Sequence, residues 1–179
     1  EKLAEVDGDR AETATRHTTF YLQQVARREQ ALIGPAQRAM LDAISTEIDN
    51  IQIAWGRAAD RCAWRLLDGA LQALYRFYHI RSRYSEGKEH FAYGLQQLTL
   101  AAGENANGSA QLHQRLLARL GAFHLALGEL DAAEAAFAVV LRDSTAPREL
   151  AFVHAQLGNS LRIRGQRQAA ESALQQSLT

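Results

Sequence analysis

Two stretches of this sequence share one spacing: Leu120-Gly121-x-x-His124-x-x-x-Gly128-x-x-x-x-Ala133-x-x-x-Phe137-x-x-x-Leu141, and, 37 residues later, Leu157-Gly158-x-x-Leu161-x-x-x-Gly165-x-x-x-x-Ala170-x-x-x-Leu174-x-x-x-Leu178. Apolar and small residues recur in both at intervals of three and four, which is the period of an α-helix. Gly128 and Gly165 interrupt the pattern at equivalent places. The spacing therefore predicts two helices joined by a turn, and predicts this hairpin twice.

The same spacing resembles the tetratricopeptide repeat. The resemblance implies an all-α fold, a right-handed superhelix of helical hairpins with a concave surface for binding. Three repeats are expected, at about 62–100, 109–142 and 146–178 within residues 61–179, and the first of them matches the pattern most weakly. Residues 1–60 are expected to form a leading helical pair, with one helix from Arg10 to about Leu32 and another from Pro35 to about Ala59.

The composition restricts the classes of partner. Of 179 residues, 20 are Lys or Arg and 20 are Asp or Glu, so no net positive field attracts nucleic acid or anionic lipid. We therefore expect no direct nucleic-acid partner and no membrane contact. The single cysteine, Cys62, fits a reducing cytosol and is expected to be a buried structural thiol, which points to a cytoplasmic protein.

A second resemblance covers residues 11 to 179 and rests on three motifs. They are Arg16-His17-x-x-Phe20-Tyr21-Leu22, Glu47-x-x-Asn50-Ile51-x-x-Ala54-Trp55 and Phe77-Tyr78-x-x-Arg81-x-x-Tyr84-x-Glu86-Gly87. These motifs are similar to the segment that joins the ATPase module to the tetratricopeptide repeats in bacterial STAND-class signalling ATPases, including LuxR-type transcriptional regulators. The resemblance implies an ATPase and winged-helix module upstream, which residues 1–60 would contact, and further repeats downstream. Ser82 stands where the resemblance favours Gly, so a positive φ there would strain the turn.

No motif for catalysis or metal binding occurs. The sequence lacks a Gly-x-x-x-x-Gly-Lys-Ser/Thr phosphate loop, a Gly-x-Ser-x-Gly nucleophile elbow and a His-x-x-x-His pair. We therefore predict no catalytic residue, no cofactor and no metal ligand. His124 occupies an aromatic position of the repeat and is expected to pack in the core, while Asp131 and Glu134 are expected to cap a helix.

The repeat register predicts a binding groove. In tetratricopeptide repeats the first helix of each hairpin lines the concave face, and the corresponding positions here are Gln72, Arg76, His79, Arg115, Arg119, Phe152, Asn159 and Arg162. The arginines would suit an acidic peptide or a carboxylate, because a guanidinium binds a carboxylate through two parallel hydrogen bonds. Asn159 stands where peptide-binding repeats often carry an Asn that holds the ligand backbone. The alternative is an unused groove lined by solvated side chains.

These observations favour a non-catalytic binding role. The chain is expected to be the protein-interaction or ligand-sensing arm of a multidomain bacterial signalling ATPase or transcriptional regulator, with a protein, a peptide or a small-molecule inducer in the groove. A standalone scaffold that binds an acidic peptide is the first alternative, and an enzyme is the second. A third is a dimer formed through Ala170, Leu174 and Leu178, because the sequence ends on a repeat without a polar closing helix and is expected to be a piece of a longer protein.

Overall fold

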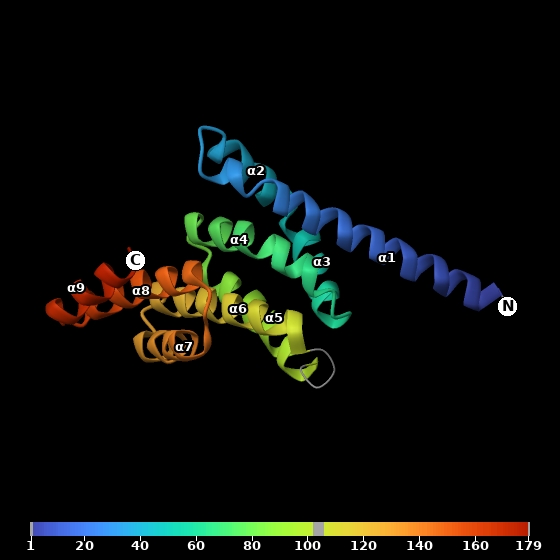
Figure 1. Cartoon of the computed structure of the whole chain (residues 1–179). Helices are drawn as coiled ribbons and strands as arrows, with labels where there is room; N and C mark the ends of the chain where they lie inside the picture. The colour runs from blue at the N-terminus through green and yellow to red at the C-terminus, as the bar shows by residue number, and fades with distance from the viewer. Residues whose placement is uncertain (1, 102–105, 179) are drawn as a thin grey trace. The chain divides into compact units, whose positions relative to one another are not determined.

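The computed structural model describes residues 2–101 and 106–178, and the side chains of residues 10–101 and 110–178 (Figure 1). In these ranges the chain forms nine α-helices and one short 3₁₀ helix, and no strand. The expectation of an all-α fold is therefore confirmed. No described helix is both long enough and apolar enough to cross a membrane.

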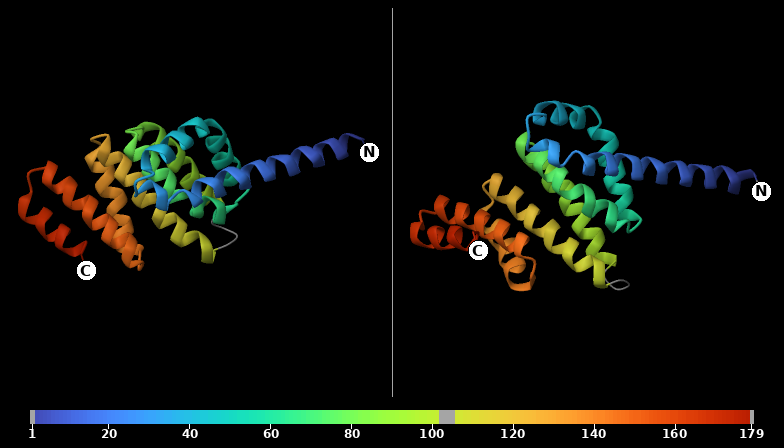
Figure 2. Two further views of the ribbon diagram at one scale, coloured as in Figure 1. Left: turned by 90° about the horizontal axis from the view of Figure 1, so that it is seen from above. Right: turned by 45° about the horizontal axis from the view of Figure 1, so that its top comes forward.

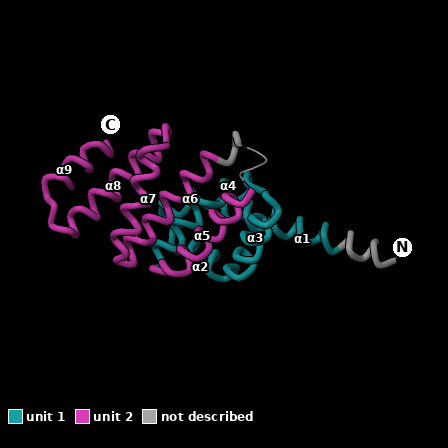
Figure 3. Tube along the Cα trace, turned by 90° about the horizontal axis from the view of Figure 1, so that it is seen from below, with its two compact units in different colours: residues 1–81 teal, residues 82–179 magenta. Residues whose placement is uncertain are grey.

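The helices fall into two compact units, residues 1–81 and 82–179, which Figure 3 draws in teal and magenta. Unit 1 contains α1 (Lys2–Arg27), η1 (Gln30–Leu32), α2 (Gln37–Thr46), α3 (Ile48–Asp60) and α4 (Trp64–Ile80). Unit 2 contains α5 (Tyr84–Ala101), α6 (Ala106–Ala126), α7 (Leu130–Asp143), α8 (Pro147–Ile163) and α9 (Arg167–Gln176). The compact units divide the chain after Arg81, whereas the sequence placed its division at residue 60. The expected hairpin at 62–100 is thus shared between the units, with α4 in unit 1 and α5 in unit 2.

Unit 1 is built on the packing of α1 against α3 and α4. Its core contains aliphatic and aromatic side chains from all three helices, including Leu22, Val25, Trp55, Leu67 and Tyr78, each at most 1% exposed. The helix expected from Pro35 to about Ala59 is instead two helices, because the backbone at Glu47 leaves helical geometry with φ −105° and ψ 11°.

Unit 2 contains the two hairpins that the repeated spacing predicts. The pairs α6–α7 and α8–α9 each pack along their length, as Figure 2 shows in yellow to red. In the first pair Gly121 lies against Phe137, so close that a Cβ on Gly121 would come within 2.5 Å of the ring. In the second pair Gly158 lies against Leu174, where a Cβ would come within 2.7 Å. The Gly of the Leu-Gly pair therefore lies at a close approach of the two helices in both hairpins.

The turns of these hairpins also match. Gly128 and Gly165 have φ values of 78° and 77°, and the amide of the next residue donates to a carbonyl five positions earlier, Glu129 to His124 and Gln166 to Leu161. This arrangement is the Schellman motif, in which the residue with positive φ is usually Gly.

Two turns outside the repeated spacing also contain a residue with positive φ, but in these turns the residue is not glycine. Ser82, between α4 and α5, has φ 55°, so the strain that the absence of Gly predicted there is present. Cys62, between α3 and α4, also has φ 55°. Its thiol is exposed, which corrects the expectation of a buried structural cysteine.

Candidate ligand-binding site

Three of the predicted groove residues meet in unit 2, around a glutamate that the sequence did not single out. Arg119 on α6 donates two hydrogen bonds to the carboxylate of Glu149 on α8, at 2.6 Å and 3.2 Å. The Arg115 Nε atom lies 3.7 Å from the Glu149 Oε1 atom, and the Arg119 guanidinium lies 3.7 Å above the centre of the Phe152 ring. The face shared by α6 and α8 is thus held together by charge and by stacking.

This cluster is buried. Arg119 is 3% exposed and Glu149 is 4% exposed, so both charges have lost most of their contact with water. Burial of a charge is unfavourable unless another charge compensates it, and here the two-pronged geometry compensates both. Arg119 is therefore occupied by a carboxylate of the chain itself.

A cavity of about 400 Å³ opens beside Glu149. Its walls are the N-terminal half of α6, the connection between α7 and α8, and the first turn of α8. The lining residues are Ala110, Gln111, Gln114, Asp143, Ser144, Thr145, Ala146 and Glu149. A volume of this size lies within the range of cavities that bind small ligands or short peptide segments.

One residue that lines the cavity carries an unused hydrogen-bond acceptor. The Oε1 atom of Gln114 is buried and has no hydrogen-bond partner among the residues that the structure describes. Buried polar groups without a partner are rare, because each has lost its bonds to water without replacement. The carboxylate of Asp143 lies in the same wall, and the hydrogen bond from Arg142 lowers its pKa, so it is ionised and also accepts. The chemistry of this wall suits a ligand that donates N–H groups.

The other predicted groove residues lie outside this cluster. Asn159 is half-buried and Arg162 is exposed, both further along α8, and no hydrogen bond between described residues joins either to Glu149. Gln72, Arg76 and His79 belong to α4 in unit 1.

Within α4 these three side chains differ in their surroundings. Gln72 and Arg76 are half-buried, and the Nε atom of Arg76 is buried without a hydrogen-bond partner among the described side chains. His79 lies at an exposed position with its ring 5.6 Å from that of Tyr75, and partial burial of the imidazole lowers its pKa. The eight residues predicted as one groove are thus divided between two units.

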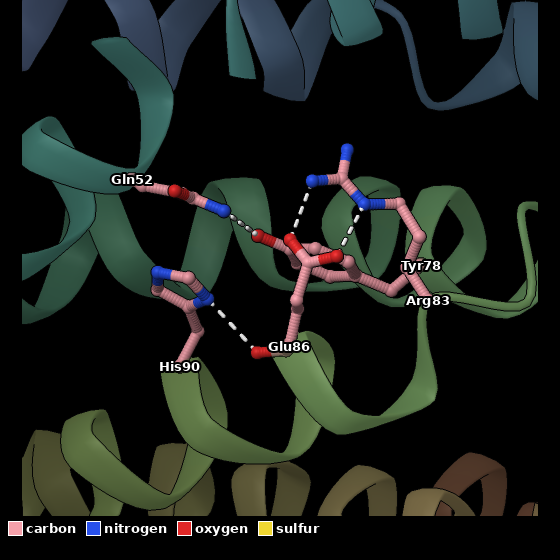
Figure 4. A network of polar contacts seen from close by, with 5 residues as sticks. All are labelled: Gln52, Tyr78, Arg83, Glu86 and His90. Carbon is pink, nitrogen blue, oxygen red and sulfur yellow. Dashed lines mark hydrogen bonds and ion pairs between the residues drawn. The ribbon is translucent and has the colours of Figure 1, made fainter. Parts of the chain in front are cut away.

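The motif residues near the end of α4 make structural contacts (Figure 4). In unit 1 the amide of Gln52 donates to the hydroxyl of Tyr78 at 3.3 Å. In unit 2 Arg83 forms an ion pair with Glu86, with its Nε atom 2.7 Å from Oε1, and the Nδ1 atom of His90 lies 2.9 Å from the Glu86 carbonyl oxygen. These contacts fix the end of α4 and the first turn of α5.

Two sequence interpretations in unit 2 are wrong. Asp131 does not cap a helix, because α7 begins at Leu130, and its carboxylate pairs with Arg164 instead. Glu134 also accepts from Arg164, at 2.8 Å, and from the hydroxyl of Ser160, at 2.6 Å, so it joins α7 to α8. These carboxylates hold the two hairpins together.

The interpretation of His124 needs a similar correction. Its side chain is 22% exposed rather than packed in the core, and it bonds to the Glu129 carboxylate. Lys88 donates to the same carboxylate at 2.7 Å. Among the side chains that the structure describes, no group of three or more His, Cys, Asp or Glu is arranged to hold a metal ion.

The predicted dimer surface at the end of unit 2 is partly exposed. Ala170 is 4% exposed, Leu174 39% and Leu178 88%. The dimer through this end stays a prediction.

Interpretation of the sequence did not identify Glu149, Gln111 or Gln114, although the sequence contains a signal for Glu149. Glu149 lies four residues before Val153, which is fully buried, and so falls on the apolar stripe of α8. An acidic residue on such a stripe requires a buried cation as its partner. Gln111 and Gln114 carry no comparable signal, because polar residues one turn apart are common on exposed helix faces.

Comparisons with protein families, with curated proteins and with solved structures found no significant match to this chain. The described residues define a helical protein with two compact units. In unit 2 a polar cavity lies beside α6 and α8, the first helices of the two matched hairpins.

Proposed function

We propose that unit 2 is a non-catalytic binding scaffold that holds a segment of a protein or peptide partner in the cavity beside Glu149. The single observation that carries this proposal concerns Gln114, which lines the cavity: its buried Oε1 atom has no hydrogen-bond partner within the described part of the chain. A peptide backbone supplies N–H donors at regular intervals, and one of them would complete the hydrogen bonding of that atom.

The two hairpins support a scaffold role. Both place a Leu-Gly pair at a close helix approach and a Gly with positive φ at the turn. Units of this kind bury their apolar faces by stacking on one another and leave an extended surface for ligands. We infer that α6–α7 and α8–α9 belong to a right-handed superhelix of tetratricopeptide type.

The buried ion pair changes the expected chemistry of the ligand. The groove arginines suggested an acidic peptide, but Arg119 already binds Glu149 through two hydrogen bonds, and Arg115 lies near the same carboxylate. An acidic ligand would have to displace a carboxylate that is held in place by its own chain. A ligand that offers backbone amides, without a requirement for acidic side chains, fits the cavity better.

In the wider setting we propose that the chain is the interaction or sensing arm of a multidomain bacterial signalling ATPase or transcriptional regulator that acts in the cytoplasm. Support for this comes from the three sequence motifs that resemble such proteins. A partner that binds the arm can regulate the ATPase module if it binds two arrangements of the whole protein with unequal affinity.

The test is a selection of random displayed peptides on the intact chain, followed by fluorescence anisotropy with the selected peptides. Gln114→Met keeps the length of the side chain but removes its amide, and we expect it to weaken binding about tenfold. Gln96→Met, at an exposed position of α5, is the matched control and should bind like the unmodified chain. Equal affinity of all three proteins would overturn the assignment of the cavity.

A further inference from the structure

Unit 1 contains a second cavity, of about 210 Å³, between α1 and the junction of α2 with α3. Its lining residues are Phe20, Tyr21, Gln24, Arg28, Glu47 and Ile51. Three of these, Phe20, Tyr21 and Gln24, belong to α1, and Arg28 directly follows the last residue of that helix. Phe20 and Gln24 are four positions apart and so lie on one face of the helix. The cavity belongs entirely to unit 1 and is independent of the site proposed in unit 2.

Two opposite charges line this small cavity without meeting. The described side chains include no carboxylate within 4 Å of the Arg28 guanidinium, and Glu47 makes no ion pair with it. Arg28 and Glu47 therefore present one positive and one negative group to the same cavity. A ligand with an anion and a cation at opposite ends would satisfy both.

Glu47 is held in its position. It lies at the break between α2 and α3, and its Oε2 atom accepts from the side-chain amide of Asn50 at 3.0 Å. Burial, and then the charge of Glu47, raises the pKa of Tyr21, which lines the same cavity. An ionised carboxylate offers about four acceptor positions, and the bond from Asn50 leaves room for a further donor.

The remaining surface of the cavity is partly apolar. Ile51 is 1% exposed and belongs to the core, whereas Phe20 is 56% exposed beside the two charges. The volume is smaller than that of a typical site for a drug-sized molecule, which begins near about 300 Å³. The cavity therefore fits a small molecule that carries one apolar group in addition to its two charges.

We propose that this cavity binds a free α-amino acid with an apolar side chain. Arg28 would hold the carboxylate through paired hydrogen bonds, Glu47 would accept from the ammonium group, and Phe20 would contact the side chain. The overall charge of such a ligand is zero, as is that of the Arg28 and Glu47 pair, so no charge remains without a partner in the complex. The site would give the chain a small-molecule input separate from the peptide site of unit 2.

The experiment is isothermal titration calorimetry of the intact chain with the twenty free amino acids. We expect leucine or a residue of similar size and polarity to bind. Three analogues then separate the contributions: leucinamide lacks the carboxylate, 4-methylpentanoate lacks the ammonium group, and glycine lacks the side chain. Leucinamide and 4-methylpentanoate should each bind at least about tenfold more weakly than leucine, since a hydrogen bond between charged groups contributes about that factor or more. Glycine should also bind at least about tenfold more weakly, because it buries no apolar side chain.

Variants assign the binding to this cavity. Arg28→Gln and Glu47→Gln remove one charge each and retain side chains that can form hydrogen bonds, and each should weaken binding at least about tenfold. The matched controls are Arg27→Gln and Asp49→Asn, at exposed neighbouring positions outside the cavity, which should bind like the unmodified chain. Circular dichroism confirms that all four variants keep their helical content.

The proposal is overturned if none of the twenty amino acids binds, if leucinamide or 4-methylpentanoate binds as tightly as leucine, or if the Arg28 and Glu47 variants bind normally. None of these results depends on a peptide partner. Failure of the site in unit 1 is therefore distinguishable from failure of the peptide site in unit 2, which is read with Gln114→Met.

Discussion

Arg119 and Glu149 form a two-pronged ion pair inside unit 2, between α6 and α8, with 3% and 4% of their surfaces exposed. The Phe152 ring covers the guanidinium from one side. Because neither charge has ready access to water, each depends on the other, and Glu149 also lines the adjacent cavity.

Removal of one partner should destabilise unit 2 strongly. Glu149→Ala leaves the Arg119 guanidinium buried with its main partner lost, and we expect the free energy of unfolding to fall by about 3 to 5 kcal/mol. Chemical denaturation measures this loss. The control is Arg142→Ala, which breaks an exposed pair with Asp143 and should cost no more than about 1 kcal/mol. A loss for Glu149→Ala no larger than that of the control would mean that the pair is solvated.

The same pair explains why charge reversal of Arg119 is a poor test of ligand binding. Such a variant places two carboxylates together in a buried position, so it would unfold unit 2 rather than report on a groove. Substitutions at Gln114 avoid this difficulty, because its Oε1 atom has no partner to lose.

The close helix approaches predict an order among three glycine substitutions. Gly121→Ala would press a Cβ against the buried Phe137 ring and should destabilise the chain by about 1 to 3 kcal/mol. Gly158→Ala meets Leu174, which is 39% exposed and can rotate away, and the backbone oxygen of Ala170 at 3.2 Å, which cannot, so its cost should be smaller but not zero. Gly56→Ala in α3 meets nothing within 4 Å and should stabilise by about 0.5 to 1 kcal/mol. Thermal or chemical denaturation of the three variants checks this order, and a Gly121→Ala variant as stable as Gly56→Ala would refute it.

The turn at Ser82 predicts a stabilising substitution. With φ 55°, Ser82 pays the steric cost of a left-handed backbone conformation, and Ser82→Gly should raise the free energy of unfolding by up to about 1 kcal/mol. Gly128→Ala makes the reverse change at φ 78° and should lower it by a similar amount. If both substitutions shifted the unfolding midpoint in the same direction, the assignment of the two turns to one backbone conformation would fail.

The lowered pKa of Glu134 predicts part of the pH dependence of the stability of the fold. The hydrogen bond from Ser160 and the neighbouring Arg164 lower the pKa of Glu134 in the folded chain. A carboxyl group with a depressed folded pKa stabilises the fold above its unfolded pKa, about 4.3, and loses this contribution as the pH falls through the folded value. Glu134→Gln should therefore flatten the acid side of the stability curve between about pH 5 and pH 3, and Ser160→Ala should have part of this effect. Urea denaturation across this range is the measurement, and identical curves for the unmodified chain and Glu134→Gln would contradict it.

The hairpins of unit 2 could be predicted from sequence, because Leu-Gly pairs and turn glycines report directly on backbone geometry. The Gly121 and Gly158 approaches follow from that pattern, whereas the strained turn at Ser82 was predicted from the resemblance to the signalling ATPases. The candidate sites could not be predicted in the same way. The pairing of Arg119 with Glu149 joins residues 30 positions apart, and no Gly or Pro marks the helix break at Glu47.

The central claim is that the cavity beside Glu149 holds the backbone of a peptide partner. The most direct test is two-dimensional NMR of the isotope-labelled 19.8 kDa chain, titrated with a peptide selected by display. We predict that the side-chain amide resonances of Gln114 and the backbone resonances of residues 143–146 shift together as the peptide binds. Shifts confined to the exposed end of α8 around Arg162, with Gln114 unmoved, would contradict the account.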